Sequence, residues 1–167
     1  MESNFAFLDQ DMDAKVLQEN AENSEKAYLN RDYSSVFTNI RVIYEHVIKQ
    51  VIDYSYKKYD FERATFAENL KYAKREKLIS SELYSKMFIM KQGGNKAAHE
   101  LSSQIYYTKD HALAGLQNEF DVLNWFAGDV LGVDYEPGTF RGSSPKCWCK
   151  LNSANLSFHK LKHTGFF

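Results

Sequence analysis

The sequence is short of residues that break helices. Its first 92 residues contain neither glycine nor proline, whereas both prolines and five of the eight glycines lie from residue 128 onward. Without them, the tight turns of a many-stranded sandwich and the glycine-rich loops that cradle phosphates are hard to build. Neither G-x-G-x-x-G nor G-x-x-x-x-G-K-[ST] occurs, so nothing supports a familiar nucleotide-binding loop. We therefore expect an all-α fold and no cofactor.

Cysteines and long apolar runs are also scarce. The two cysteines fall within the last 27 residues, so the body of the chain has no disulfide framework. No run approaches the ~18 apolar residues of a membrane span, and the N-terminus lacks the basic and then apolar pattern of a signal peptide. We expect a cytoplasmic protein with no membrane partner.

Acidic residues are absent from the end of the chain. The net charge is −5 over residues 1–32, −1 over residues 33–140 and +5 over residues 141–167. The near-neutral body lacks the field of a dedicated nucleic-acid binder, so such contact is expected to be local or supplied by a larger assembly. Helical periodicity is lost after residue 132. We predict a helical domain over residues 1–140 and a basic, poorly ordered extension over residues 141–167.

Apolar residues recur at helical spacing in five segments. The predicted helices cover residues 12–29, 34–52, 65–77, 80–90 and 108–130. The second has the widest apolar face and should cross the core after a cap at Ser34 or Ser35. The third begins with a Thr65–Glu68 capping box. The fourth meets two glycines at positions 93 and 94, and the sequence does not decide whether the helix is continuous with residues 96–99. Together they predict a compact up-and-down bundle of four to five helices.

A basic cluster follows the predicted capping box. It consists of Lys71, Lys74, Arg75 and Lys77. Contact with DNA phosphates is one interpretation, and it predicts binding that weakens steeply with salt. A solvated helix face is simpler, because Glu68 and Glu76 are interspersed and no aromatic stacking platform is evident nearby. Tyr56, Tyr59 and Tyr72 would supply a platform only if the fold brought them round.

The C-terminal extension contains four residues that can bind metals. They are Cys147, Cys149, His159 and His163. Structural zinc sites usually space their cysteines by two to four residues, and Cys-x-Cys followed by a nine-residue gap departs from that pattern. Free thiols in an unstructured extension are the simpler interpretation, so we expect no metal site.

One histidine lies in a polar setting on the fourth helical segment. Asn95 and His99 are four residues apart, with Glu100 adjacent and Lys91 one turn earlier, so on a continuous helix they share a face. A histidine in such a position most often has a structural role at a helix junction. Catalysis by His99 would need a cation to stabilise developing phosphate charge.

Several segments together carry a family likeness. They are residues 3–8, 21–22, 41–45, 90–100 and 125–126. They resemble the N-terminal helical domain of type I restriction enzyme R subunits, over about residues 3–140. In that family the domain precedes an endonuclease and an ATP-driven DNA translocase, whose motifs do not occur in this sequence. The resemblance implies a non-catalytic interaction or assembly domain of an R-subunit-like protein in DNA defence. Its implied partners are other domains or subunits of a restriction-type complex, through which it would reach nucleic acid.

That domain in turn resembles the HEPN superfamily of helical bundles. Its nuclease members carry an arginine, a polar residue and then a histidine about four positions on; Asn95 and His99 match the last two, while Gly94 takes the place of the arginine. The R-subunit domains generally show glycine before this asparagine, which implies a structural motif of Gly93, Gly94, Asn95, His99 and Glu100. Superfamily members often pair through this region, so the resemblance also implies a homodimer.

The alternative function belongs to a different class. A HEPN-type, metal-independent RNase or toxin-like enzyme with a degenerate site would use His99 as acid and base, and Lys91 or Lys96 as the cation. Glycine at position 94 argues against this alternative, because it offers no side chain to a scissile phosphate.

Overall fold

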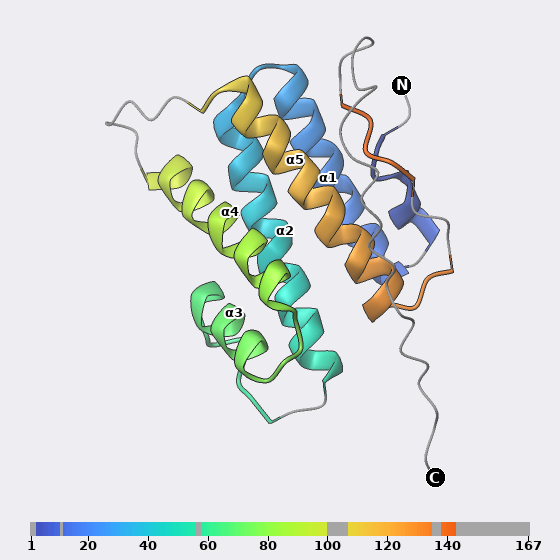
Figure 1. Cartoon of the computed structure of the whole chain (residues 1–167), viewed down its shortest axis with the longest axis vertical. Coiled ribbons are helices and arrows are strands. Elements are labelled where there is room, and N and C mark those ends of the chain that lie inside the picture. Colours follow the sequence, from blue (N-terminus) through green and yellow to red (C-terminus); the bar gives the residue numbers. More distant parts are fainter. Residues whose placement is uncertain (1–2, 11, 56–57, 100–106, 135–137, 143–167) are drawn as a thin grey trace.

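The described part of the chain is entirely helical. The computed structural model describes residues 3–10, 12–55, 58–99, 107–134 and 138–142, without the side chains of residues 10, 13 and 94–99. Its elements are η1 (Ala6–Gln10), α1 (Met12–Leu29), α2 (Tyr33–Tyr54), α3 (Phe66–Arg75), α4 (Ser81–His99), α5 (Lys109–Trp125) and η2 (Phe126–Val130). These ranges contain no strand. The predicted all-α bundle is confirmed (Figure 1).

The central element is α2, which contacts α1, α3, α4 and α5. Figure 1 shows α1 and α5 side by side along one flank, α4 along the other and the short α3 beside the lower end of α4. Nine side chains of α2 are buried, from Val36 to Ile52, and Tyr44 is the largest fully buried side chain. Each such apolar side chain contributes about 1.5–3 kcal/mol when it leaves water, which explains why the widest apolar stripe occupies the middle.

Helix α2 begins earlier than the sequence predicted. Its N-cap is Asp32, whose carboxylate accepts hydrogen bonds from the backbone N–H and the hydroxyl of Ser35 and from the hydroxyl of Ser34. The predicted cap at Ser34 or Ser35 was therefore wrong, because both serines are used as donors to the aspartate. These bonds, led by that of the Ser35 hydroxyl, lower the pKa of Asp32.

Two helices end in tight turns without the usual glycine. Arg31 and Lys77 adopt left-handed backbone conformations, with φ of 63° and 59°. In each turn, the backbone N–H of the following residue donates a hydrogen bond to the carbonyl five residues earlier. Asp32 donates to Ala27, and Leu78 donates to Ala73. This is the Schellman arrangement, which normally places glycine at the left-handed position. The absence of glycine before residue 93 therefore did not exclude tight helix ends.

The remaining helix ends agree better with the sequence. The Thr65–Glu68 capping box is present, and the Thr108 hydroxyl caps α5. Helix α4 passes through both glycines to His99, which settles the question of continuity. The last predicted helix divides into α5 and the π-helical turn η2, and Gly132 follows with φ of 70°. Within the described ranges, no helix combines the length and apolar content that crossing a bilayer requires.

Candidate functional site

The glycine pair lies inside α4, where that helix packs against α2. A Cβ atom added to Gly93 would lie 2.8 Å from Cδ1 of the buried Phe37. The Tyr107 hydroxyl donates a 2.5 Å hydrogen bond to the Gly93 carbonyl, and the Tyr107 ring lies 4.5 Å from the Phe37 ring between centroids. Gly93 therefore permits a close approach that joins α2, α4 and the segment before α5.

The polar side chains of the motif at residues 93–100 lie outside the part of the chain that the structure describes. Nothing is described of the side chains of Asn95, Lys96 and His99, and Glu100 lies outside the described residues. Their structural or catalytic roles stay predictions. Lys91 is partly exposed, and its Nζ atom lies 5.7 Å from the centre of the Phe88 ring.

The basic cluster is exposed, and two of its members cover aromatic rings. Lys71, Lys74, Arg75 and Lys77 are all exposed. The Lys74 ammonium lies 4.1 Å from the centre of the Tyr84 ring on α4, and the Arg75 guanidinium lies 5.1 Å from that of Tyr72 on α3. At these distances the cations interact with the π faces.

The fold meets the condition for an aromatic platform beside this cluster, because it brings two of the three named tyrosines together. The segment between α2 and α3 places Tyr59 on Tyr72, with ring centres 3.8 Å apart and planes within 8° of parallel. On α4, Tyr84 and Phe88 form a second near-parallel pair, with centres 5.7 Å apart and an interplanar angle of 15°. Both pairs are half-buried. Tyr56 lies outside the described residues.

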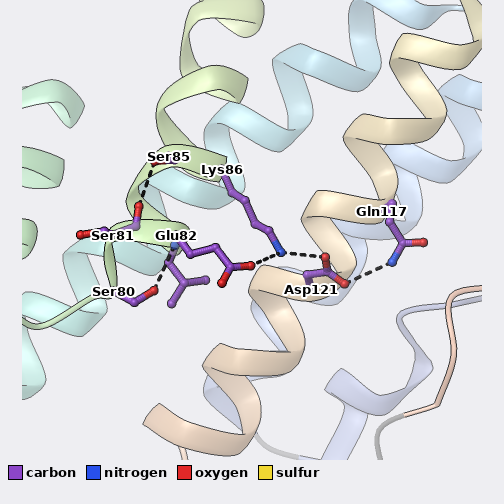
Figure 2. A network of polar contacts seen from close by, with 8 residues as sticks. Ser80, Ser81, Glu82, Ser85, Lys86, Gln117 and Asp121 are labelled. Carbon is purple, nitrogen blue, oxygen red and sulfur yellow. Dashed lines mark hydrogen bonds and ion pairs between the residues drawn. The ribbon is translucent and has the colours of Figure 1, made fainter. Parts of the chain in front are cut away.

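The acidic residues near the cluster all have partners, and one partner belongs to the cluster, because the Glu76 carboxylate pairs with Arg75 at 3.1 Å. Glu68 closes the capping box, and the hydrogen bond from the Thr65 hydroxyl is the main reason that the pKa of Glu68 is lowered. Glu82 pairs at 3.3 Å with Lys86, which also binds Asp121 on α5 at 2.9 Å (Figure 2). Burial lowers the pKa of Lys86, but its two acidic partners outweigh this effect and the net shift is upward.

A buried polar group on α5 bonds to α1, and the predictions from the sequence did not include it. Glu119 is fully buried; one carboxyl oxygen accepts a 3.3 Å hydrogen bond from Ser24, and the other has no partner in the described part of the chain. Burial is the main cause that raises the pKa of Glu119 well above its usual value. Burial, followed by the charge of Glu119, raises the pKa of Tyr44. The signal was available, because Glu119 shares the apolar face of Leu116 and Leu123.

The chain ends of the described structure border a cavity of about 270 Å³. Its charged lining contains Glu22, Glu25, Lys26 and Arg141. The Glu25 carboxylate is already engaged by Ser3 and Asn4. Because acids and bases are equal in number, the lining favours neither sign of ligand charge.

No metal centre emerges among the residues whose placement is described, because no three His, Cys, Asp or Glu side chains gather there. The tail residues Cys147, Cys149, His159 and His163 lie outside those residues. Comparison of the chain with family models, curated proteins and solved structures finds no match.

Proposed function

We propose that this chain is a non-catalytic interaction or assembly domain of a restriction-type R-subunit-like protein. The observation that carries this proposal is the packing of Gly93, the first residue of the G-G-N segment, against Phe37. Because the first residue of this motif packs two helices together, the motif has a structural role that does not require catalysis. The likeness of residues 90–100 to the R-subunit domain supplies the family context.

The position of the glycine pair also argues against phosphate chemistry. Gly94 continues the helix and has no side chain with which to contact a scissile phosphate. The arginine position of the nuclease motif therefore offers no cation, and general acid–base cleavage by His99 would need charge stabilisation from a lysine elsewhere on the helix.

The absence of cleavage is the direct biochemical prediction. The purified full chain is incubated with end-labelled single-stranded RNA in EDTA, and the products are resolved on a denaturing gel. We expect no cleavage above that of a His99→Ala preparation. Cleavage by the parent chain that disappears in His99→Ala would overturn the proposal and establish the RNase alternative.

The genomic context tests the assembly role separately. We expect restriction endonuclease and translocase motifs in frame after codon 167, or genes for other restriction-complex subunits beside this one. In the second case, the purified subunits should co-elute with the chain in size-exclusion chromatography. A locus with neither feature, or subunits that elute independently, would contradict the assembly role.

A further inference from the structure

One surface of α3 and α4 alternates cations with aromatic rings. We call it the cation–aromatic strip, and it consists of Tyr72, Lys74 and Arg75 on α3 and Tyr84, Phe88 and Lys91 on α4. Tyr84, Phe88 and Lys91 are spaced four and three residues apart, so they lie on one face of α4. Lys74 links the two helices because its ammonium lies over Tyr84. The strip is therefore continuous across the two helices.

The lysines of the strip are available to an anionic ligand. In the described structure, Lys74 and Lys91 contact aromatic faces and no carboxylate lies within ion-pair distance of either. Lys71 extends the positive surface on α3. The nearby Glu82 is neutralised by Lys86, as Figure 2 shows. The strip thus has a local positive charge although the whole chain has a net charge of −1.

The aromatic rings of the strip offer surfaces on which bases can stack, a feature that a site for anions alone would not need. Tyr59 extends the strip by stacking on Tyr72, and the Tyr84–Phe88 pair is nearly parallel as well. All four rings are half-buried, so the fold fixes their planes while part of each ring stays accessible. Fixed aromatic planes beside Lys74 and Lys91, which have no carboxylate partner in the described structure, provide the two components that bind single-stranded nucleic acids without sequence preference. An acidic peptide would use only the cations.

We propose that the cation–aromatic strip binds single-stranded nucleic acid. Phosphates bind Lys71, Lys74 and Lys91, and bases stack on Tyr59 and, as the Lys74 ammonium moves from the ring to a phosphate, on Tyr84. This proposal goes beyond the assembly function and does not depend on it. With these three phosphates neutralised, log K should fall against log salt with a slope of about −2. Affinity should therefore drop about 20-fold between 50 and 200 mM salt.

The test is fluorescence anisotropy of labelled dT20 and rU20 with the full chain. Lys74→Gln/Lys91→Gln should weaken binding at least about fivefold at 50 mM salt and reduce the magnitude of the salt slope by about 1.4. The matched control is Lys15→Gln/Lys109→Gln, which removes the same charge from exposed positions on α1 and α5. The control should bind as the parent does. Equal losses in both double variants would overturn the proposal.

A second variant tests the stacking component. Tyr84→Leu retains apolar volume but removes the ring, and it should weaken binding about 5- to 100-fold with an unchanged salt slope. Each variant is compared with the parent by thermal unfolding, and only folded protein is titrated. Unchanged affinity of a folded Tyr84→Leu variant would overturn the proposal, as would tighter binding of a 20-base-pair duplex than of either single strand.

The basic extension requires its own control because it carries a net charge of +5. A variant with all four of its lysines replaced by glutamine, at positions 146, 150, 160 and 162, should retain most of the binding. Loss of binding in this variant, with retention in Lys74→Gln/Lys91→Gln, would assign the interaction to the extension and overturn the proposal. Absence of binding by the parent chain at 50 mM salt would do so as well.

Discussion

At the scale of single residues, Glu119 is a carboxyl group removed from water. It receives one hydrogen bond, from Ser24, while burial and then the nearby charge of Glu25 raise its pKa. A buried carboxylate with one partner is costly, so the group is protonated in the folded state at pH values where an exposed glutamate is charged. A neutral carboxyl at this position makes stability depend on pH.

The sign of that dependence follows from proton linkage. Because the folded-state pKa of Glu119 exceeds its unfolded value, the folded chain holds the proton more tightly. The stabilisation is fully present below the unfolded pKa of about 4.3. It is lost as the pH rises toward the folded pKa, by up to about 1.4 kcal/mol per pH unit.

Glu119→Gln should remove this loss, because glutamine resembles the protonated acid and does not ionise. We expect the free energy of unfolding of Glu119→Gln, measured in urea between pH 4 and 8, to exceed that of the parent increasingly as the pH rises. Glu19→Gln is the control, since Glu19 is exposed on α1. Parallel pH profiles for the parent and Glu119→Gln would contradict protonation of the buried carboxyl.

At the scale of elements, the packing of α4 on α2 depends on small residues opposite large ones. A Cβ at Gly93 would lie 2.8 Å from Cδ1 of Phe37, and on α5 a Cβ at Gly115 would lie 3.2 Å from Cδ1 of Ile40. By contrast, a Cβ at Gly128 in η2 would meet nothing within 4 Å. The glycines that follow the breaker-free stretch thus serve as contact points between helices as well as turn residues.

Comparison of two glycine-to-alanine variants isolates the close contact. Alanine improves helix propensity by up to about 1 kcal/mol at both Gly93 and Gly128, so this gain largely cancels when the stabilities of the two variants are compared. The Phe37 ring is buried and has little room to move, and overpacking costs typically about 1–3 kcal/mol. We expect the free energy of unfolding of Gly93→Ala, measured by chemical denaturation, to be about 1–3 kcal/mol lower than that of Gly128→Ala. Equal stability of the two variants would show that α4 can shift without cost.

The sequence predicted the helices well and their ends less well. Periodicity identified all five because a buried stripe at spacings of three and four is a strong local signal. The start of α2 was wrong because Asp32 and the two serines are all good caps. The structure uses Asp32, which directly follows the left-handed Arg31 at the end of α1. The capping box at Thr65 was predictable because its two partners lie three residues apart.

At the scale of the whole molecule, the candidate surface was only half predictable. The basic residues of α3 are visible at helical spacing, but their aromatic neighbours come from elsewhere in the chain. Tyr59 reaches Tyr72 from an irregular segment, and Tyr84 meets Lys74 only because α3 packs on α4. Such pairs depend on tertiary packing, for which a single sequence contains no local pattern. The homodimer implied by the family resemblance stays a prediction.

The two ends of the described chain meet beside α1. The Asn4 side-chain amide donates to Glu25 at 2.6 Å and to the Arg141 carbonyl at 3.1 Å, and its oxygen accepts from the Arg141 backbone N–H at 2.7 Å. Phe120 on α5 contacts both Phe5 and Phe140 through ring edges or tilted rings. One asparagine therefore fixes the segment after η2 onto the start of the chain, over an apolar base.

Asn4→Ala should release that segment while the bundle stays folded. Each hydrogen bond lost is worth about 0.5–1.5 kcal/mol, and the freed groups of Arg141 can bond to water because the site is exposed. We expect hydrogen exchange at the Arg141 amide, resolved by NMR, to accelerate at least about tenfold, which is the equivalent of about 1.4 kcal/mol. Amides in the middle of α2 should change far less, because that helix is held by its buried face. Asn30→Ala alters an exposed asparagine in the turn before α2 and should leave the Arg141 amide unaffected. If the Arg141 amide exchanges at the same rate in the parent and in Asn4→Ala, the aromatic contacts alone hold the chain ends together.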